Sequence, residues 1–200
     1  MNLDDLLGTS AEEGNIENYW YFKLLSERSI LFNEECSQDI VEKIGMPLLK
    51  FDQDSSNDPV HLYINSEGGD VFSSLWICNI IDNYHKPLYI HVLGFALSMG
   101  FLLAVAGKNN PNVHTDCYPF SVFMLHSGSL SLSSDLSKAK SFMKFNNNLE
   151  TTEKNYILTH TSIDEDTYEK CIDSDYWLTA DQALEYHIVD SIIGVESDEK

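Results

Sequence analysis

The chain has few basic residues. Lysine and arginine together number 12, against 32 aspartates and glutamates, so the formal net charge is −20 over 200 residues. Proteins that bind nucleic acid neutralise phosphates with lysine and arginine, and an anionic membrane surface attracts the same positive charge. The composition therefore predicts that neither nucleic acid nor a membrane surface is a partner.

Long apolar runs are also missing. The longest apolar stretch, from Gly94 to Gly107, falls short of the ~18 residues that a membrane span needs and indicates buried core. The first basic residue is Lys23, and no apolar segment follows a positive one near the start, so no secretory signal is expected. We expect a soluble cytoplasmic protein, and the sequence is equally compatible with an organellar stroma or matrix, or with a virus-encoded protein in a host cytoplasm.

Motifs for metals, redox chemistry and nucleotides are lacking as well. The four cysteines are scattered without a CxxC pair, and none of the seven histidines forms an HExxH motif. Gly107-Lys108 is the sole Gly-Lys pair, and Asn109 stands where a P-loop has Ser or Thr. We therefore expect a reducing compartment, no metal site and no cofactor, and any ATP dependence must come from a partner.

The order of predicted elements indicates the fold class. Residues 1–18 are polar and acidic without periodicity, which predicts a flexible segment before a single domain at 19–200 that begins near Tyr19. Composition and periodicity predict helices at about 37–49, 71–84, 99–106, 133–160, 163–172 and 180–186, and strands at 29–32, 60–64, 88–93, 121–125 and 188–193. A polar loop without catalytic residues is expected at 52–59. Strands that alternate with helices predict an α/β fold with a mainly parallel sheet.

Ser98 lies where the strand at 88–93 gives way to the helix at 99–106. A hydroxyl at a helix N-terminus most often caps the helix by accepting from a backbone N–H group. The same position also suits a nucleophile, because the bare N–H groups beside it can hold the oxyanion that forms when a carbonyl is attacked. The serine alone does not decide between these roles.

Two further strand ends carry polar residues. Gly68 and Gly69 follow the strand at 60–64 and allow a tight turn with exposed N–H groups, although a plain turn with Asp70 as helix N-cap is the simpler interpretation. His126 ends the strand at 121–125, where a simple loop imidazole is the alternative. With Ser98, these corners supply a nucleophile, a base and N–H donors, which is the set that acyl transfer requires.

From about Tyr21 to Ile193 the chain resembles the Clp protease proteolytic subunit (ClpP) family of serine peptidases. The blocks that carry the resemblance, in order, lie at 22–32, 61–69, 94–100, 123–126 and 175–190. The family fold is a crotonase-like α/β spiral of βαβ units with a protruding long helix, which corresponds here to about 133–160. The resemblance therefore predicts that fold.

The resemblance also assigns catalytic roles. Ser98 matches the nucleophile and His126 the general base, while Asp175 matches the third triad member on the resemblance alone. The backbone N–H groups of Gly69 and Met99 match the oxyanion hole, and Met99 also follows from its place directly after the nucleophile. A complete Ser-His-Asp triad implies a serine endopeptidase.

Partners follow from the same resemblance. In the family the long helix interlocks two heptameric rings into a tetradecameric chamber that cuts unfolded proteins or peptides, and an AAA+ unfoldase such as ClpX or ClpA docks on the ring ends. This chain departs from the family pattern at the docking pocket, where His61, Asn83 and His91 replace residues that are usually aromatic or apolar, while Tyr63 is kept. It also carries Glu67 and Asp70 beside the oxyanion turn.

Two alternatives remain open at this point. The acidic residues beside the oxyanion turn suit a catalytically weak or inactive ring subunit that scaffolds or modulates an active paralogue. An acyl-CoA enzyme of the crotonase type is a more distant possibility, since that chemistry does not need a Ser-His-Asp triad.

Overall fold

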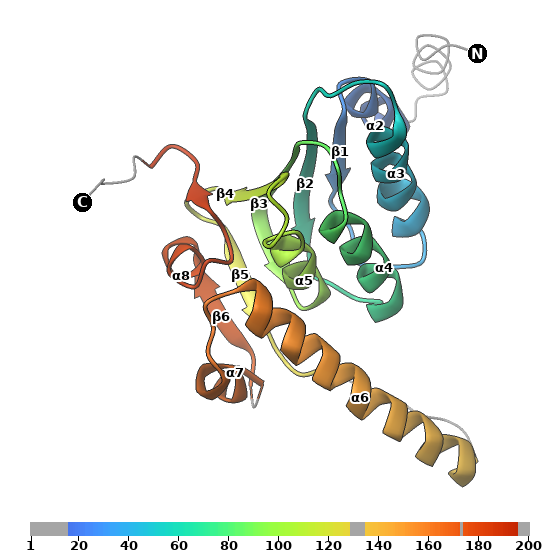
Figure 1. Ribbon diagram of the computed structural model, residues 1–200, viewed down its shortest axis with the longest axis vertical. Coiled ribbons are helices and arrows are strands. Elements are labelled where there is room, and N and C mark those ends of the chain that lie inside the picture. Colours follow the sequence, from blue (N-terminus) through green and yellow to red (C-terminus); the bar gives the residue numbers. More distant parts are fainter. Residues whose placement is uncertain (1–15, 129–134, 173, 196–200) are drawn as a thin grey trace.

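The computed structural model describes residues 16–128, 135–172 and 174–195 (Figure 1). The helices are α2 (Ile16–Ser26), the π-helical turn η1 (Val41–Gly45), α3 (Met46–Gln53), α4 (Val71–Asp82), α5 (Met99–Val105), α6 (Leu136–His160), α7 (Glu165–Ile172) and α8 (Ala180–Glu185). The strands are β1 (Ser29–Phe32), β2 (Val60–Ser66), β3 (Leu88–Leu97), β4 (Val113–Cys117), β5 (Val122–Leu125), β6 (Tyr176–Thr179) and β7 (Ser191–Ile192).

The strands form one sheet. Its main path runs β1-β2-β3-β4-β7, with every neighbouring pair parallel. The first half of β3 pairs with β4, and its last residues pair with β5, which is antiparallel to β6. The predicted α/β architecture of βαβ units around a mainly parallel sheet is confirmed, and the β5–β6 pair adds one antiparallel ladder.

Two strands were not predicted. The segment of β4 contains the polar residues His114, Thr115 and Asp116, so its sequence lacks the apolar pattern of a buried strand. In the structure it pairs with β3 on one side and β7 on the other. Strand β6 pairs with β5, which lies about fifty residues earlier in the chain, so its formation depends on a long-range contact that local sequence does not encode. The last strand, expected over 188–193, is limited to Ser191–Ile192.

Three predicted boundaries were wrong. Helix α2 begins at Ile16, ahead of the expected start of order at Tyr19, while residues 1–15 of the expected flexible segment lie outside the described residues. The helix expected at 37–49 begins as a π-helical turn and continues as α3 to Gln53, which shortens the expected loop at 52–59. Strand β3 continues to Leu97, so Gly94 lies within the strand and the turn to α5 comes at Ser98.

The core lies between the sheet and its helices. Tyr84, Phe32, Phe101 and Phe123 are the largest fully buried side chains. All seven residues of α5 are buried, which makes this helix a fixed element within the core. A side chain on the corner just before α5 is therefore rigidly placed.

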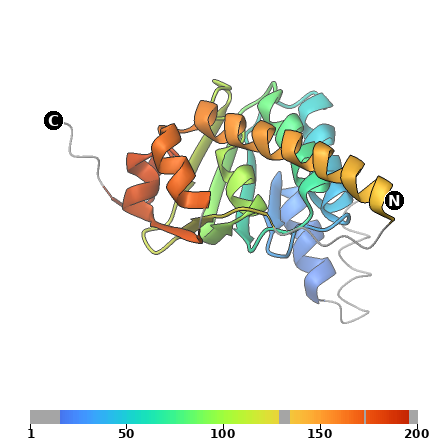
Figure 2. The same ribbon diagram turned by 90° about the horizontal axis from the view of Figure 1, so that it is seen from below.

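Helix α6 projects from the body. Its His160 end lies near the sheet and its Leu136 end extends away from it (Figure 1), and in the perpendicular view the helix crosses the molecule (Figure 2). The helix begins at Leu136, and its N-cap Asp135 accepts a hydrogen bond from the Lys138 N–H; the predicted start at 133 lies outside the described residues. Several apolar side chains along this helix are exposed, namely Leu136, Phe142, Met143 and Phe145.

The His160 end of α6 is attached by polar contacts. The Tyr156 hydroxyl donates to Asp82 at the end of α4 over 2.9 Å, and His160 Nε2 lies 3.4 Å from the same carboxylate. Lys154 bridges to Glu165 of α7 over 2.7 Å. These contacts fix the part of α6 that lies nearest to Ser98 in the fold.

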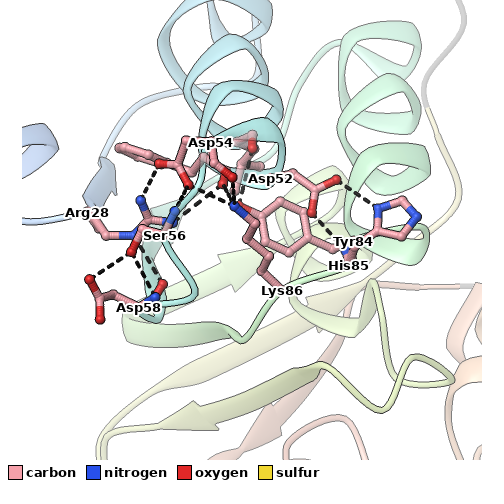
Figure 3. A network of polar contacts seen from close by, with 10 residues as sticks. Arg28, Asp52, Asp54, Ser56, Asp58, Tyr84, His85 and Lys86 are labelled. Carbon is pink, nitrogen blue, oxygen red and sulfur yellow. Dashed lines mark hydrogen bonds and ion pairs between the residues drawn. The ribbon is translucent and has the colours of Figure 1, made fainter.

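A buried lysine is compensated where α3 ends. The Lys86 ammonium, 11% exposed, donates to Oδ1 of Asp54 over 2.8 Å, and Arg28 donates to Oδ2 over 2.5 Å (Figure 3). These two cations lower the pKa of Asp54 from 3.8 to about 2. The segment expected as a plain polar loop thus anchors β1 and the start of β3.

The lowered pKa of Asp54 gives a pH-dependent contribution to stability. Because the folded protein holds the carboxylate ionised more strongly than the unfolded chain does, the contribution is fully present above about pH 5 and is lost as pH falls toward 2. We expect Asp54→Asn to lower the urea midpoint near neutral pH. The difference between the two proteins should shrink as the pH falls below the unfolded value of 3.8.

Urea titrations followed by circular dichroism between about pH 7 and pH 3 measure this difference. Asp58→Asn is the matched control, because Asp58 lies in the same loop and its side chain contacts Ser56 rather than a lysine or arginine. A difference between wild type and Asp54→Asn that stays constant over the whole range would contradict the expectation.

Candidate active site

Ser98 occupies the corner between β3 and α5. Its backbone dihedrals, φ 52° and ψ −119°, lie in a region that residues other than glycine rarely adopt. Such a conformation costs about 1–3 kcal/mol and persists only where the surrounding structure imposes it. Here the Ser98 N–H donates to Met124 of β5 over 2.9 Å, and the buried α5 follows directly.

The Ser98 side chain does not cap α5. Although the residue stands at the N-cap position, its hydroxyl accepts no hydrogen bond from the helix backbone. Oγ lies instead 2.9 Å from Nε2 of His126. The capping role that the sequence suggested first is therefore absent, and the hydroxyl is directed toward a basic nitrogen.

The sheet brings His126 and Asp175 together. In the antiparallel ladder of β5 and β6, Leu125 pairs with Tyr176, so the residues that follow β5 and precede β6 face each other. His126 Nδ1 lies 3.2 Å from Oδ1 of Asp175. In the tautomer with its proton on Nδ1, His126 donates to Asp175 and accepts from the Ser98 hydroxyl through Nε2.

The turn at Gly68 and Gly69 packs against the Ser98 corner. Gly68 has φ 91°, and a Cβ there would lie 2.6 Å from the Leu97 carbonyl oxygen and 2.8 Å from the Met99 nitrogen, so any other residue is excluded. The Gly68 carbonyl accepts from the Cys36 N–H, and the Cys36 carbonyl accepts from the Asp70 N–H, both over 2.6 Å. The glycine turn is thereby held beside Ser98.

Two amide groups at this corner are free. Neither Gly69 N–H nor Met99 N–H donates to any acceptor among the described residues. Both residues line the same cavity as Ser98. The structure thus brings all five residues selected from the sequence, namely Ser98, His126, Asp175, Gly69 and Met99, to one place.

Asp70 has the simple role considered for it. Its side chain accepts a hydrogen bond from the Ser73 N–H over 2.8 Å at the start of α4, as an N-cap does. The carboxylate is therefore engaged by its own helix. Glu67, in contrast, is exposed and lines the cavity.

The cavity beside Ser98 has a volume of about 310 Å³. Its apolar walls come from α5, β5, α6 and α7, through Met99, Leu102, Leu125, Ile157 and Tyr168. Three carboxylates, from Glu35, Glu67 and Glu153, also line it. Burial raises the pKa of Glu153, and the nearby Glu150 raises it further.

Sequence reasoning did not single out Glu35 or Glu153. Glu35 follows β1, and only the folded turn around Cys36 brings it to Gly69. Glu153 lies one helical turn before the buried Ile157, so the helical spacing of α6 does place it on the face toward the body. That spacing was the available signal.

A polar cluster lies at two of the positions where the resemblance predicted a docking pocket. His61 Nδ1 lies 2.9 Å from His91 Nε2, and His91 Nδ1 lies 2.7 Å from Oδ1 of Asp116, across β2, β3 and β4. The Tyr63 ring stacks on His91 with centroids 4.9 Å apart. Burial lowers the pKa of His61, and the adjacent His91 lowers it further.

No group of three or more His, Cys, Asp or Glu side chains within residues 16–128, 135–172 and 174–195 is arranged to hold a metal ion. Across the same ranges, no helix combines the length and the apolar character that crossing a bilayer requires.

Comparison with known proteins identifies a family. The model of the Clp protease family matches residues 12–196. The ATP-dependent Clp protease proteolytic subunit 2 of Treponema pallidum (strain Nichols) is 28% identical over 199 residues, which covers 99% of this chain and 98% of that protein. The ATP-dependent Clp protease proteolytic subunit 1 of Salinibacter ruber (strain DSM 13855 / M31) is 28% identical over 176 residues, with 86% of this chain and 73% of that protein covered.

Proposed function

Because this chain belongs to the Clp protease family, we propose that it is a serine endopeptidase that hydrolyses peptide bonds of unfolded proteins or peptides. One observation carries the proposal: the contacts from Asp175 Oδ1 to His126 Nδ1, 3.2 Å, and from His126 Nε2 to Ser98 Oγ, 2.9 Å, form a continuous path. This is the geometry in which an orienting acid, a base and a nucleophile cooperate.

The proposed reaction has two halves. His126 Nε2 takes the Ser98 proton while Oγ forms a bond to the peptide carbonyl carbon, and the tetrahedral intermediate then releases the amine as the C–N bond breaks and His126 returns the proton. Water attacks the resulting ester by the same route, which yields a carboxylic acid and restores Ser98. Asp175 holds the tautomer of His126 and stabilises the imidazolium that forms transiently.

The free amides of Gly69 and Met99 are proposed as the oxyanion hole. Both residues line the cavity of Ser98, and neither N–H group has an acceptor among the described residues, which leaves both donors available to a developing oxygen anion. Removing one such donor in serine peptidases lowers turnover by about 10²–10³-fold. The fixed glycine turn therefore supports catalysis directly.

Assembly and partners form a further part of the proposal. The exposed apolar side chains on α6 support its use as a contact between subunits, with heptameric rings stacked as a tetradecamer, and an AAA+ unfoldase of the ClpX or ClpA type would supply unfolded substrate. The Treponema pallidum and Salinibacter ruber relatives are both named as proteolytic subunits of ATP-dependent Clp proteases. His61 and His91 make the proposed docking pocket more polar than the apolar pocket of the family, which implies that the partner segment bound there is also more polar.

A fluorophosphonate probe tests the proposed function. Native mass spectrometry first establishes which assembly the purified protein forms, and the probe is then added to that assembly. Covalent labelling at Ser98 together with hydrolysis of a short fluorogenic peptide is the expected result. An assembled, folded sample that takes up no label would overturn the proposal.

A catalytically weak or inactive ring subunit is the second candidate. It is favoured by the carboxylates of Glu35 and Glu67 at the cavity, since negative charge near a forming oxyanion opposes its stabilisation. Peptide hydrolysis by the purified chain alone would exclude this candidate. Activity that appears only after a paralogue is added would favour it.

A further inference from the structure

The negative charge of the Ser98 cavity is not balanced by a lysine or arginine among its described lining residues. Of the described residues that line it, three are glutamates and none is lysine or arginine. The Glu153 carboxylate forms no hydrogen bond or ion pair with any described residue, and the residue is partly buried. A partly buried carboxylate without a partner is unfavourable, because it loses hydration and gains nothing in return.

Neighbouring charged residues do not compensate the negative charge of Glu153. Lys154, the next residue on α6, is engaged by Glu165 and Glu169 over 2.7 and 2.5 Å, on the side of the helix that faces α7. Glu150, one turn earlier, adds negative charge and raises the pKa of Glu153 beyond the effect of burial. No described lysine or arginine forms an ion pair with Glu153, so a cationic group of a bound ligand would be the first positive charge to meet this carboxylate.

The lining of the cavity indicates which ligand would supply such a charge. Ser98 lines it together with Met99, whose N–H group has no acceptor among the described residues. Leu102, Leu125 and Ile157 add apolar walls to the same cavity, and Glu153 lies on α6 one helical turn before Ile157. An extended side chain with an apolar stem and a cationic end matches this combination of apolar walls and a carboxylate.

We infer that Glu153 makes this site prefer substrates with lysine or arginine at the residue whose carbonyl is attacked. The inference rests on the proposed peptidase function and names its substrate class. The stem of the basic side chain packs on Leu102 and Leu125, and its charged end reaches the Glu153 carboxylate. Glu35 and Glu67, at the exposed edge, attract cationic peptides toward the cavity.

A pair of matched substrates tests the inference. Peptidyl aminocoumarins, which carry peptide only on the acyl side, are made with lysine or with norleucine at the last residue, so that the two differ in the ammonium group alone. We expect kcat/KM to be about tenfold higher for lysine, because its ammonium group forms one partly desolvated ion pair with Glu153. Equal values, or a preference for norleucine, would overturn the inference.

Variants assign the preference to one carboxylate. Glu153→Gln should reduce the lysine-to-norleucine ratio to near one, whereas Glu150→Gln, the same charge change one turn away and outside the cavity, should leave the ratio as in the wild type. A ratio that Glu153→Gln does not alter would contradict the role of Glu153. If the variant does not assemble, inhibition of the wild type by paired lysine and norleucine peptide aldehydes gives the same comparison.

The outcomes separate the two proposals. Fluorophosphonate labelling without a lysine preference leaves the peptidase function in place and removes the specificity. Neither labelling nor hydrolysis of any peptide removes both. Labelling with a lysine preference that depends on Glu153 supports both.

Discussion

Replacing Ser98 by alanine is expected to lower peptide hydrolysis by about a million-fold, to the rate that binding and the oxyanion donors alone sustain. The variant loses the oxygen proposed to form the covalent bond to the substrate, and the 2.9 Å contact to His126 disappears with it. Fluorophosphonate labelling should disappear completely. The measurement is a peptide assay together with in-gel detection of the label.

Folding should not change in this variant. Alanine keeps the backbone of the corner, and the Ser98 hydroxyl makes no capping bond whose loss would weaken α5. Ser26→Ala, which alters an exposed serine on α2, is the matched control and should retain full labelling. If Ser98→Ala is labelled as strongly as the wild type, the nucleophile is a different residue.

Asp175→Asn is expected to lower kcat/KM by about 10²–10³-fold. Loss of the acid in a buried triad costs about 10⁴-fold, because the histidine is no longer held in the tautomer that accepts from serine. Here the Asp175 side chain is 57% exposed and its contact to His126 is long, at 3.2 Å. Water therefore screens and partly replaces the carboxylate, which makes the expected loss smaller.

The Asp175 measurement compares kcat and KM with labelling rates. Since Asp175 does not line the cavity, KM should stay close to the wild-type value while kcat falls. Asp166→Asn, an exposed carboxylate on α7, is the control for a general change in charge. A fall of less than about threefold for Asp175→Asn would indicate that His126 is oriented by another group.

Much of the site was predictable because it lies at strand ends. Ser98 between a predicted strand and a predicted helix, His126 at the end of another strand and the glycine turn together suggested a nucleophile, a base and N–H donors, although none of them did so alone. The carboxyl ends of adjacent parallel strands meet at one edge, and here β3 and β5 do pair. The paired glycines, Gly68 and Gly69, were predictable as a tight turn for the same reason.

The rest depends on contacts that are distant in the chain. Asp175 reaches His126 only because β6 pairs antiparallel with β5, and that pairing has no local signal among 32 acidic residues. Glu153 enters the cavity because α6 packs against α5, so its role depends on tertiary packing. Strand β4 escaped prediction because burial between two strands, and not apolar composition, makes it a strand.

The exposed apolar side chains of α6 affect the solubility of a subunit that has not yet assembled. Leu136, Phe142, Met143 and Phe145 remain in water until another molecule covers them. A newly synthesised chain that has not yet assembled exposes the apolar surface of α6 to chaperones and to other unassembled copies. The concentration of unassembled subunits, more than the stability of each fold, then decides how many subunits assemble and how many aggregate.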